Sequence, residues 1–317
     1  MSTFDAGINI LSKIGFVGLG AMGAPLARNL ARHGHKLAVF DVRPNAWDVF
    51  RDLHVRVATS PADAAEGVDF LMTVLPTSND VDEVVLGRGG AVETLHPGAI
   101  LIDSTTASPT QSMALAATLA DREIGMVDAT LGRPPWDAEA GTMLFLLGGS
   151  DEHLAVVRPI LEAMGKDFVY CGPQGSAAKV KAINNYMSVL GMVVAAEALA
   201  FGAQAGIDRD VLLKVLQSTV AGRGAINVLY PMKVLAGDVT PLFSMRLAHK
   251  DLGVALNFGA TLGMPLATGA AGREVLGFGQ VVGRFDQDVT ALLLALEELF
   301  LARRDAEPKA TVDWNGE

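Results

Sequence analysis

The first half of the chain contains short apolar runs separated by longer segments of mixed polarity. Each run has the length of a buried strand and lacks the alternation of a half-exposed one. The runs lie at residues 14–17, 37–41, 69–76, 99–103, 126–129 and 143–147. The segment after the first run has helical spacing at Leu26 and Leu30. The pattern predicts an α/β region built on a parallel sheet.

In the second half the strand pattern stops and helical spacing takes over. Residues 176–206 contain no proline and predict one long helix. A further helix is predicted after Asp208, whose carboxylate can cap it. Others are predicted from Met245 and over the apolar residues 289–301, with residues 220–224 as a loop. We therefore expect an all-α C-terminal domain joined to the α/β part by a long interdomain helix.

The length of the chain agrees with this division, because 317 residues correspond to two domains at about 150 residues each. We place the α/β domain at residues 1–174, with residues 1–12 as an N-terminal extension. The helical domain is placed at residues 175–317, with the connecting helix at residues 175–205.

A glycine pattern follows the first predicted strand and precedes the first predicted helix. Gly18, Gly20 and Gly23 form G-x-G-x-x-G, with Ala21 and Met22 before the last glycine. The first glycine permits a tight turn, the second lets a pyrophosphate approach the backbone, and the third lets helix and strand pack closely. The helix N-terminus then faces the phosphates. We expect these five residues to contact a dinucleotide; the alternative is a glycine turn that binds no ligand.

An acidic residue ends the second predicted strand. Asp41 lies about 20 residues after the glycine pattern. A carboxylate at this place bonds the ribose 2′-hydroxyl and repels a 2′-phosphate. We therefore predict an NAD-binding Rossmann domain that prefers NAD(H) to NADP(H). Arg43 follows two residues later and can soften that preference.

Two further strands run into turns that we also assign to the cofactor. The run at residues 69–76 ends at Leu75 and Pro76, and the run at residues 99–103 leads to Thr106. Parallel strands end at one edge of their sheet, where a dinucleotide lies. We expect Leu75, Pro76 and Thr106 to contact it.

A polar stripe marks the predicted long helix. Lys181, Asn184, Asn185 and Ser188 are spaced i, i+3, i+4 and i+7, so they share one face between apolar neighbours. Buried polar groups need partners. We interpret the stripe as a ligand site; the alternative is a structural network between the two domains.

The loop at residues 130–136 contains an arginine between a glycine and two prolines. Arg133 follows Gly132 and precedes Pro134 and Pro135. An arginine in such a loop can hold an anion by two parallel hydrogen bonds. The alternative is a solvated surface arginine.

Composition narrows the class of protein. The net charge of −10 argues against a nucleic-acid partner or an anionic membrane surface. No run approaches about 18 uninterrupted apolar residues, so we expect no membrane span. Cys171 is the single cysteine, which favours a cytoplasmic location. The six histidines form no metal-binding spacing, so we expect no metal site.

A second glycine pattern lies at residues 277–283. It follows a predicted helix and has the wrong spacing, so we do not assign it to a nucleotide.

Taken together, these motifs resemble the β-hydroxyacid dehydrogenases, the family of 3-hydroxyisobutyrate dehydrogenase and tartronate semialdehyde reductase. The resemblance covers nearly the whole chain, from the glycine pattern to residues 250–252. Within the family it is strongest to the sulfolactaldehyde reductases, through Gly132, Arg133 and residues 183–188, 234–238 and 247–253. In that subgroup an arginine at the position of Arg133 holds a sulfonate. The prolines after it depart from the more polar loop of the subgroup.

The resemblance implies roles for the polar residues. It implies a homodimer or homotetramer that interconverts a small anionic aldehyde and its hydroxy acid with NAD(H). Lys181 would be the general acid in reduction and the base in oxidation, and Asn185 would orient it or the carbonyl. Arg133, with Gly132, and Asn184 and Ser188 would hold the anionic end. Lys250 would reach the nicotinamide from the C-terminal domain.

Several alternatives stay open at this point. The substrate is either 3-sulfolactaldehyde with its product 2,3-dihydroxypropane-1-sulfonate, or a compound of the 3-hydroxyisobutyrate, tartronate semialdehyde or succinate semialdehyde type. A non-catalytic NAD-binding protein is a second class, against which the lysine argues. An imine reductase or a decarboxylating enzyme of the 6-phosphogluconate type is a third.

Overall fold

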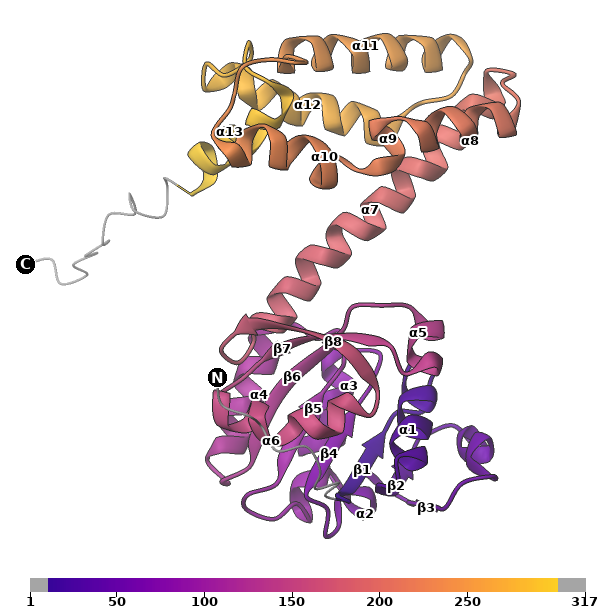
Figure 1. Cartoon of the computed structure of the whole chain (residues 1–317), viewed down its shortest axis with the longest axis vertical. Coiled ribbons are helices and arrows are strands. Elements are labelled where there is room, and N and C mark those ends of the chain that lie inside the picture. Colours follow the sequence, from indigo (N-terminus) through magenta and orange to yellow (C-terminus); the bar gives the residue numbers. More distant parts are fainter. Residues whose placement is uncertain (1–10, 302–317) are drawn as a thin grey trace, which may run out of the picture. The chain divides into compact units, whose positions relative to one another are not determined.

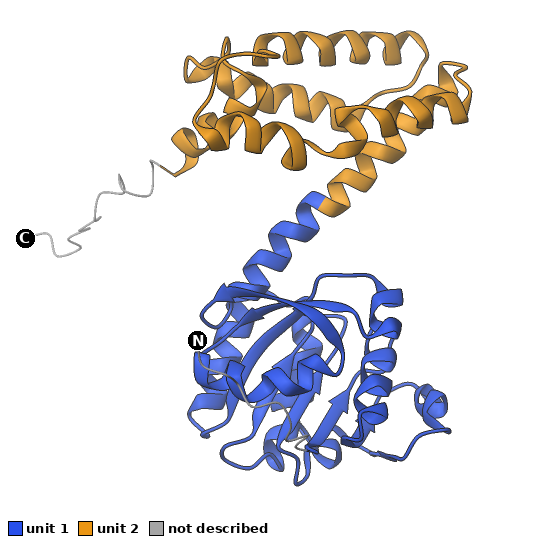
Figure 2. Cartoon of the chain, viewed as in Figure 1, with its two compact units in different colours: residues 1–187 blue, residues 188–317 orange. Residues whose placement is uncertain are grey.

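A computed structural model describes residues 11–301 of the chain. The chain divides into two compact units, with the boundary between residues 187 and 188 (Figure 2). The described parts of these units are residues 11–187 and residues 188–301. The division falls inside the helix α7 (Ser176–Gln204), which is continuous through it. The predicted domain boundary between residues 174 and 175 stays a prediction.

The first unit is built on one eight-stranded sheet (Figure 1). Its strand order is β3-β2-β1-β4-β5-β6-β7-β8, the doubly wound order 3-2-1-4-5-6 extended by two strands. All neighbours pair in parallel except β6 and β7, which are antiparallel. The strands are β1 (Lys13–Val17), β2 (Lys36–Phe40), β3 (Val55–Val57), β4 (Phe70–Thr73), β5 (Ile100–Asp103), β6 (Gly125–Leu131), β7 (Met143–Gly148) and β8 (Gly165–Gly172).

Helices cover both faces of this sheet. Side chains alternate along each strand, so neighbouring residues pack against helices on opposite faces. Phe16, Met72 and Ile102 face a core that includes α1 and α6. Their neighbours Leu71 and Leu101 face a second core with α2, α3 and α4. Because both faces of the inner strands β1, β4 and β5 are buried, these strands are mostly apolar. The helices are α1 (Gly23–Arg32), η1 (Ala46–Phe50), α2 (Pro61–Ala65), α3 (Ser78–Leu86), η2 (Ala91–Glu93), α4 (Pro109–Ala120), α5 (Pro135–Ala140) and α6 (Asp151–Glu162).

The predicted α/β architecture and six predicted strands are confirmed, but three features differ. The strands β3 and β8 were not predicted, because both are edge strands with few buried residues. Residues 130–136 are not one loop, since β6 continues to Leu131 and α5 begins at Pro135. A proline fits the first turn of a helix, because no backbone N–H is needed there. The short α5 also returns the chain directly, which makes β7 antiparallel to β6.

The second unit is helical, as predicted. Asp208 caps α8 by accepting hydrogen bonds from the amides of Asp210 and Val211. The predicted loop at residues 220–224 is wrong, because residues 220–223 form a single helical turn despite Gly222. The elements after α7 are α8 (Arg209–Ser218), α9 (Val220–Arg223), α10 (Ala225–Met232), η3 (Val234–Ala236), α11 (Met245–Thr261), α12 (Ala267–Val281), η4 (Val289–Ala291) and α13 (Leu292–Phe300).

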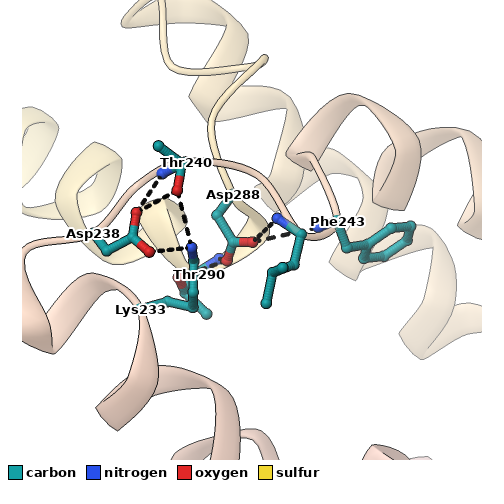
Figure 3. Close-up of polar contacts among 7 residues, drawn as sticks. Lys233, Asp238, Thr240, Phe243, Asp288 and Thr290 are labelled. Carbon is teal, nitrogen blue, oxygen red and sulfur yellow. Dashed lines mark hydrogen bonds and ion pairs between the residues drawn. The ribbon is translucent and has the colours of Figure 1, made fainter.

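Two aspartates fix the loop between η3 and α11 (Figure 3). The buried ammonium of Lys233 pairs with Asp238 and lies 3.3 Å from the Thr240 hydroxyl. This pairing lowers the pKa of Asp238 to about 2. Asp288 accepts hydrogen bonds from the amide of Phe243, at 3.4 Å, and from the Thr290 hydroxyl, at 2.8 Å. The loop is thus tied to the start of η4.

The helix α7 is long and apolar enough to cross a membrane by length and composition, the one such helix among residues 11–301. A core helix of a soluble protein has the same properties. Near its start, Ala177 and Ala178 are buried in the first unit. Toward its end, Glu197 accepts a hydrogen bond from the amide of Thr268 at 3.1 Å in the second unit. Both ends therefore take part in folded units.

Candidate active site at the carboxyl edge of the sheet

The three glycines of the loop after β1 have three separate structural roles. Gly18 has φ +97°, and a Cβ there would collide with the Val74 carbonyl. A Cβ on Gly23 would collide with the Gly18 carbonyl, so this glycine allows α1 to start against the turn. At Gly20 no atom lies within 4 Å of the place of a Cβ. The open space at Gly20 therefore leaves the backbone accessible, which fits a pyrophosphate approaching it.

A cavity of about 470 Å³ lies over this loop. Its lining contains Gly18, Gly20, Ala21, Met22 and Gly23 from the loop, Asp41 and Arg43 after β2, and Leu75 and Pro76 after β4. Within the first unit the residues assigned to the cofactor thus lie together, except Thr106, which lines the neighbouring pocket described below. The cavity has the size of small-molecule sites in general.

Asp41 does not present a free carboxylate to this cavity. One oxygen accepts hydrogen bonds from the Leu19 amide, at 2.8 Å, and from Arg43 Nη2, at 3.1 Å. The other accepts from the Arg43 amide, at 2.8 Å, and from Arg43 Nε, at 3.0 Å. Burial alone would raise the pKa of Asp41, but these bonds hold it below its usual value. Since a carboxylate has about four acceptor positions, a ribose hydroxyl must displace one of these bonds.

A second pocket, of about 400 Å³, adjoins the first, because both are lined by Met22, Val74 and Leu75. It carries two cationic side chains and no acidic one. The remaining lining residues are Ser104, Thr106, Leu131, Arg133, Pro134, Pro135 and Lys181. A compound bound here would lie beside the cofactor cavity and next to two positive charges.

Lys181 is held in place by the end of β6. Its ammonium donates a hydrogen bond to the Leu131 carbonyl at 2.6 Å. Burial lowers the pKa of Lys181 from its usual value, since a desolvated ammonium is less stable. Among residues 11–301 no carboxylate forms an ion pair with it. The lysine therefore has a geometry and a pKa direction suited to proton transfer.

The start of α7 is anchored by a buried carboxylate that the sequence did not single out. Asp128 in β6 accepts hydrogen bonds from the Gly175 amide at 2.6 Å, from Gln174 Nε2 at 2.5 Å and from the Ser112 hydroxyl at 2.7 Å. Burial raises its pKa. Because Lys181 lies two turns further along α7, this anchor positions it relative to β6.

Arg133 lines the second pocket, but part of its guanidinium is engaged by the protein. Nη1 donates a hydrogen bond to the Thr142 carbonyl at 2.6 Å. Nη2 forms an ion pair with Asp167 of β8, also at 2.6 Å. The Gly132 amide bonds the Leu144 carbonyl of β7 at 2.8 Å, which fixes the backbone before the arginine. The predicted contact between Arg133 and a substrate anion stays a prediction.

The other predicted site residues fall into two groups. Asn184 and Asn185 follow Lys181 on α7, and Asn184 donates a 3.4 Å hydrogen bond to Asn185. Ser188 and Lys250 belong to the second unit, where Lys250 forms an exposed ion pair with Asp251. The roles of these four residues stay predictions. In the same unit, His249 contacts the Phe285 ring edge-on.

One further residue of the pocket was missed as a site residue. The Ser104 hydroxyl is buried and has no hydrogen-bond partner among the described residues, although Ser104 lines the second pocket. A buried hydroxyl needs a partner, which fits a ligand with polar atoms. The polar residues in the turn after β5 were the sequence signal that could have identified Ser104.

Within residues 11–301 no group of three or more His, Cys, Asp or Glu side chains is placed to hold a metal ion.

Comparison with known proteins defines the class. Residues 13–172 match the family model described as the NAD binding domain of 6-phosphogluconate dehydrogenase. Residues 175–296 match the model described as NAD-binding of NADP-dependent 3-hydroxyisobutyrate dehydrogenase. With the dinucleotide-type fold and cavity, these matches make the protein an NAD(P)-linked oxidoreductase.

Individual relatives place it within that class. It is 40% identical to 3-sulfolactaldehyde reductase of Escherichia coli (strain K12), over 89% of this chain and 95% of that protein. It is 31% identical to human mitochondrial 3-hydroxyisobutyrate dehydrogenase, over 90% of this chain and 87% of that protein. The solved structure of Mycobacterium tuberculosis 3-hydroxyisobutyrate dehydrogenase with L-serine matches with a TM-score of 0.62 and 27% identity, covering 90% of this chain and 99% of that one. The chain belongs to the β-hydroxyacid dehydrogenase family.

Proposed function

We propose that this dehydrogenase interconverts a small anionic aldehyde and its hydroxy acid, with NAD(H) preferred and Lys181 as general acid and base. The observation that carries the proposal is the pocket containing Lys181 and Arg133, which shares three lining residues with the cofactor cavity. One cation serves proton transfer and the other serves anion binding. The similarity to 3-sulfolactaldehyde reductase favours a sulfonate as the anion.

The chemistry follows from the positions of these groups. When bound, the nicotinamide supplies the hydride in reduction and accepts it in oxidation. Lys181 donates a proton to the oxygen that becomes the hydroxyl, and in the reverse direction its neutral amine removes that proton. The Leu131 carbonyl orients the ammonium, and Asn185 assists it from the next turn of α7. Arg133, Asn184 and Ser188 would hold the anionic end, and Lys250 would contact the nicotinamide.

The function is tested with purified protein, NADH and a set of short aldehydes. 3-Sulfolactaldehyde is expected to be reduced with a higher kcat/KM than the semialdehydes of succinate and tartronate or the aldehyde related to 3-hydroxyisobutyrate. A neutral aldehyde of the same size is expected to be a poor substrate. If a carboxylate aldehyde is preferred, the sulfonate assignment fails but the reaction class remains. If no acidic aldehyde is reduced, the proposed function is wrong.

A variant of Arg133 tests the binding of the anion. Arg133→Ala is expected to raise KM for an anionic aldehyde by about 10-fold or more, the scale of one charged hydrogen bond. Arg133→Lys keeps the charge without the planar fork and is also expected to weaken binding. A neutral aldehyde provides the control and is expected to change little. Equal losses for both aldehydes would mean that Arg133 only supports the loop.

A variant of Arg43 tests the preference for the cofactor. We expect wild-type kcat/KM to be higher with NADH than with NADPH, because Asp41 repels a 2′-phosphate. Arg43→Ala is expected to increase this preference about 10-fold, since it frees the Asp41 carboxylate and removes a cation available to the phosphate. Steady-state kinetics with both cofactors provide the measurement. A wild-type enzyme that works equally well or better with NADPH would mean that Arg43 outweighs Asp41.

A further inference from the structure

The ion pair between Arg133 and Asp167 joins the second pocket to an edge strand. Arg133 lines the pocket, whereas Asp167 lies on β8 and is not part of the lining. The two side chains are 34% and 54% exposed, so both are accessible to a small solute. Because β8 pairs with β7, whose Leu144 carbonyl holds the Gly132 amide, the backbone brings Asp167 beside the arginine.

Arg133 has an acidic partner, which an anionic substrate would have to displace or share. Among residues 11–301, Asp167 is the only acidic side chain that forms an ion pair with it. A carboxylate on Nη2 occupies donor positions that an anionic substrate would use and cancels part of the positive charge. The substrate anion and Asp167 therefore compete for one guanidinium.

The hydrogen bond from Arg133 to the Thr142 carbonyl holds the guanidinium in place without contributing a charge. The Thr142 carbonyl holds Nη1 independently of Asp167. In an Asp167→Asn variant the amide oxygen can still accept a hydrogen bond from Nη2. The arginine would keep its place while the competing negative charge is removed.

We propose that Asp167 is a specificity-determining residue, whose carboxylate competes with the anionic group of the substrate for Arg133. This proposal rests on the proposed function. Asp167 weakens the binding of anionic aldehydes and hydroxy acids, and so keeps the product from being retained. It leaves neutral compounds unaffected.

The test measures binding and turnover separately. Calorimetric titration of 2-hydroxyethanesulfonate into the enzyme–NADH complex reports anion binding without catalysis. Asp167→Asn is expected to strengthen this binding about threefold, the scale of a partly exposed ion pair. The KM for anionic aldehydes is expected to fall by a similar factor, with little change in kcat or in the KM for a neutral aldehyde.

Asp52→Asn provides the matched control. Asp52 is an exposed aspartate paired with Arg28 at 2.9 Å in the same unit, and neither residue lines the second pocket. The variant removes the same charge and is expected to leave the binding of 2-hydroxyethanesulfonate unchanged. An equal gain in both variants would reduce the effect to net charge and overturn the proposal.

Other outcomes are equally decisive. Weaker binding in Asp167→Asn would show that Asp167 positions Arg133, and unchanged binding would show that the pair does not exchange with the ligand; either result overturns the proposal. The gain must also disappear when Arg133→Ala is added, as a double-mutant cycle requires. If the sulfonate binds more tightly but no acidic aldehyde is reduced, the proposed function fails while the competition stands.

Discussion

Replacing Lys181 with alanine is expected to lower kcat for aldehyde reduction by about 100-fold or more while NADH binding changes little. The expected size is that of a positioned general acid. Lys181 lies in the second pocket and not in the lining of the cofactor cavity, which is why binding should survive. Stopped-flow kinetics and a fluorescence titration with NADH give the two quantities. Lys179→Ala, which removes an exposed lysine from the same helix, is the control and should retain activity.

The pH profile adds a second readout for Lys181. Burial lowers its pKa, so its titration should occur below the range of an ordinary lysine. Reduction needs the ammonium, so its rate should fall as pH rises through this pKa. Oxidation needs the neutral amine, so its rate should rise over the same range. In Lys181→Ala both the fall in the reduction rate and the rise in the oxidation rate over this pH range should be absent. A variant with normal turnover would favour a structural role for the polar stripe on α7.

Replacing Gly20 with valine is expected to weaken NADH binding by about 100-fold without unfolding the protein. The place of a Cβ at Gly20 is empty, so the new side chain fits the protein but fills the space beside the backbone that a pyrophosphate approaches. The same change at Gly18 would collide with the Val74 carbonyl and would test folding instead. Thermal unfolding and an NADH titration separate the two effects.

Gly277→Val is the control for this variant. Gly277 also has no atom within 4 Å of the place of its Cβ, and it starts the glycine pattern at residues 277–283 that the sequence assigned to no nucleotide. It lies in α12. NADH binding should be unchanged in this variant. Unaffected binding in Gly20→Val, by contrast, would place the pyrophosphate elsewhere.

The residues that line the first cavity were largely predictable from the sequence because their signals are local. The glycine pattern, Asp41 and the ends of β4 and β5 each combine a strand with the turn after it, and parallel strands place such turns at one edge. Hydrophobic runs are sufficient to find these strands. The hydrogen bonding of Asp41 was not predictable, since three of its four hydrogen bonds come from Arg43 as it folds back and the fourth from the Leu19 amide.

The surroundings of the second pocket were less predictable because its contacts join distant segments. Asp128 meets Gln174 and Gly175 across 46 and 47 positions of the chain. Asp167 lies on β8, a mostly exposed strand without a clear apolar pattern. Sequence spacing identifies which residues share a helix face or a strand end. It does not identify which carboxylate approaches a particular cation from another strand.

The partner of the Lys181 ammonium is a main-chain oxygen, and this has a consequence for how such enzymes diverge. No side-chain replacement at Leu131 deletes its carbonyl, so an alanine scan would not detect this contact. Two residues later, just after the end of β6, lies Arg133, whose contribution to the pocket is a side chain that a substitution can change. If the proposed roles hold, descendants of this chain can exchange the group proposed to recognise the substrate and still inherit the main-chain support of the proposed proton donor. An insertion or deletion between residues 131 and 133 would instead disturb both at once.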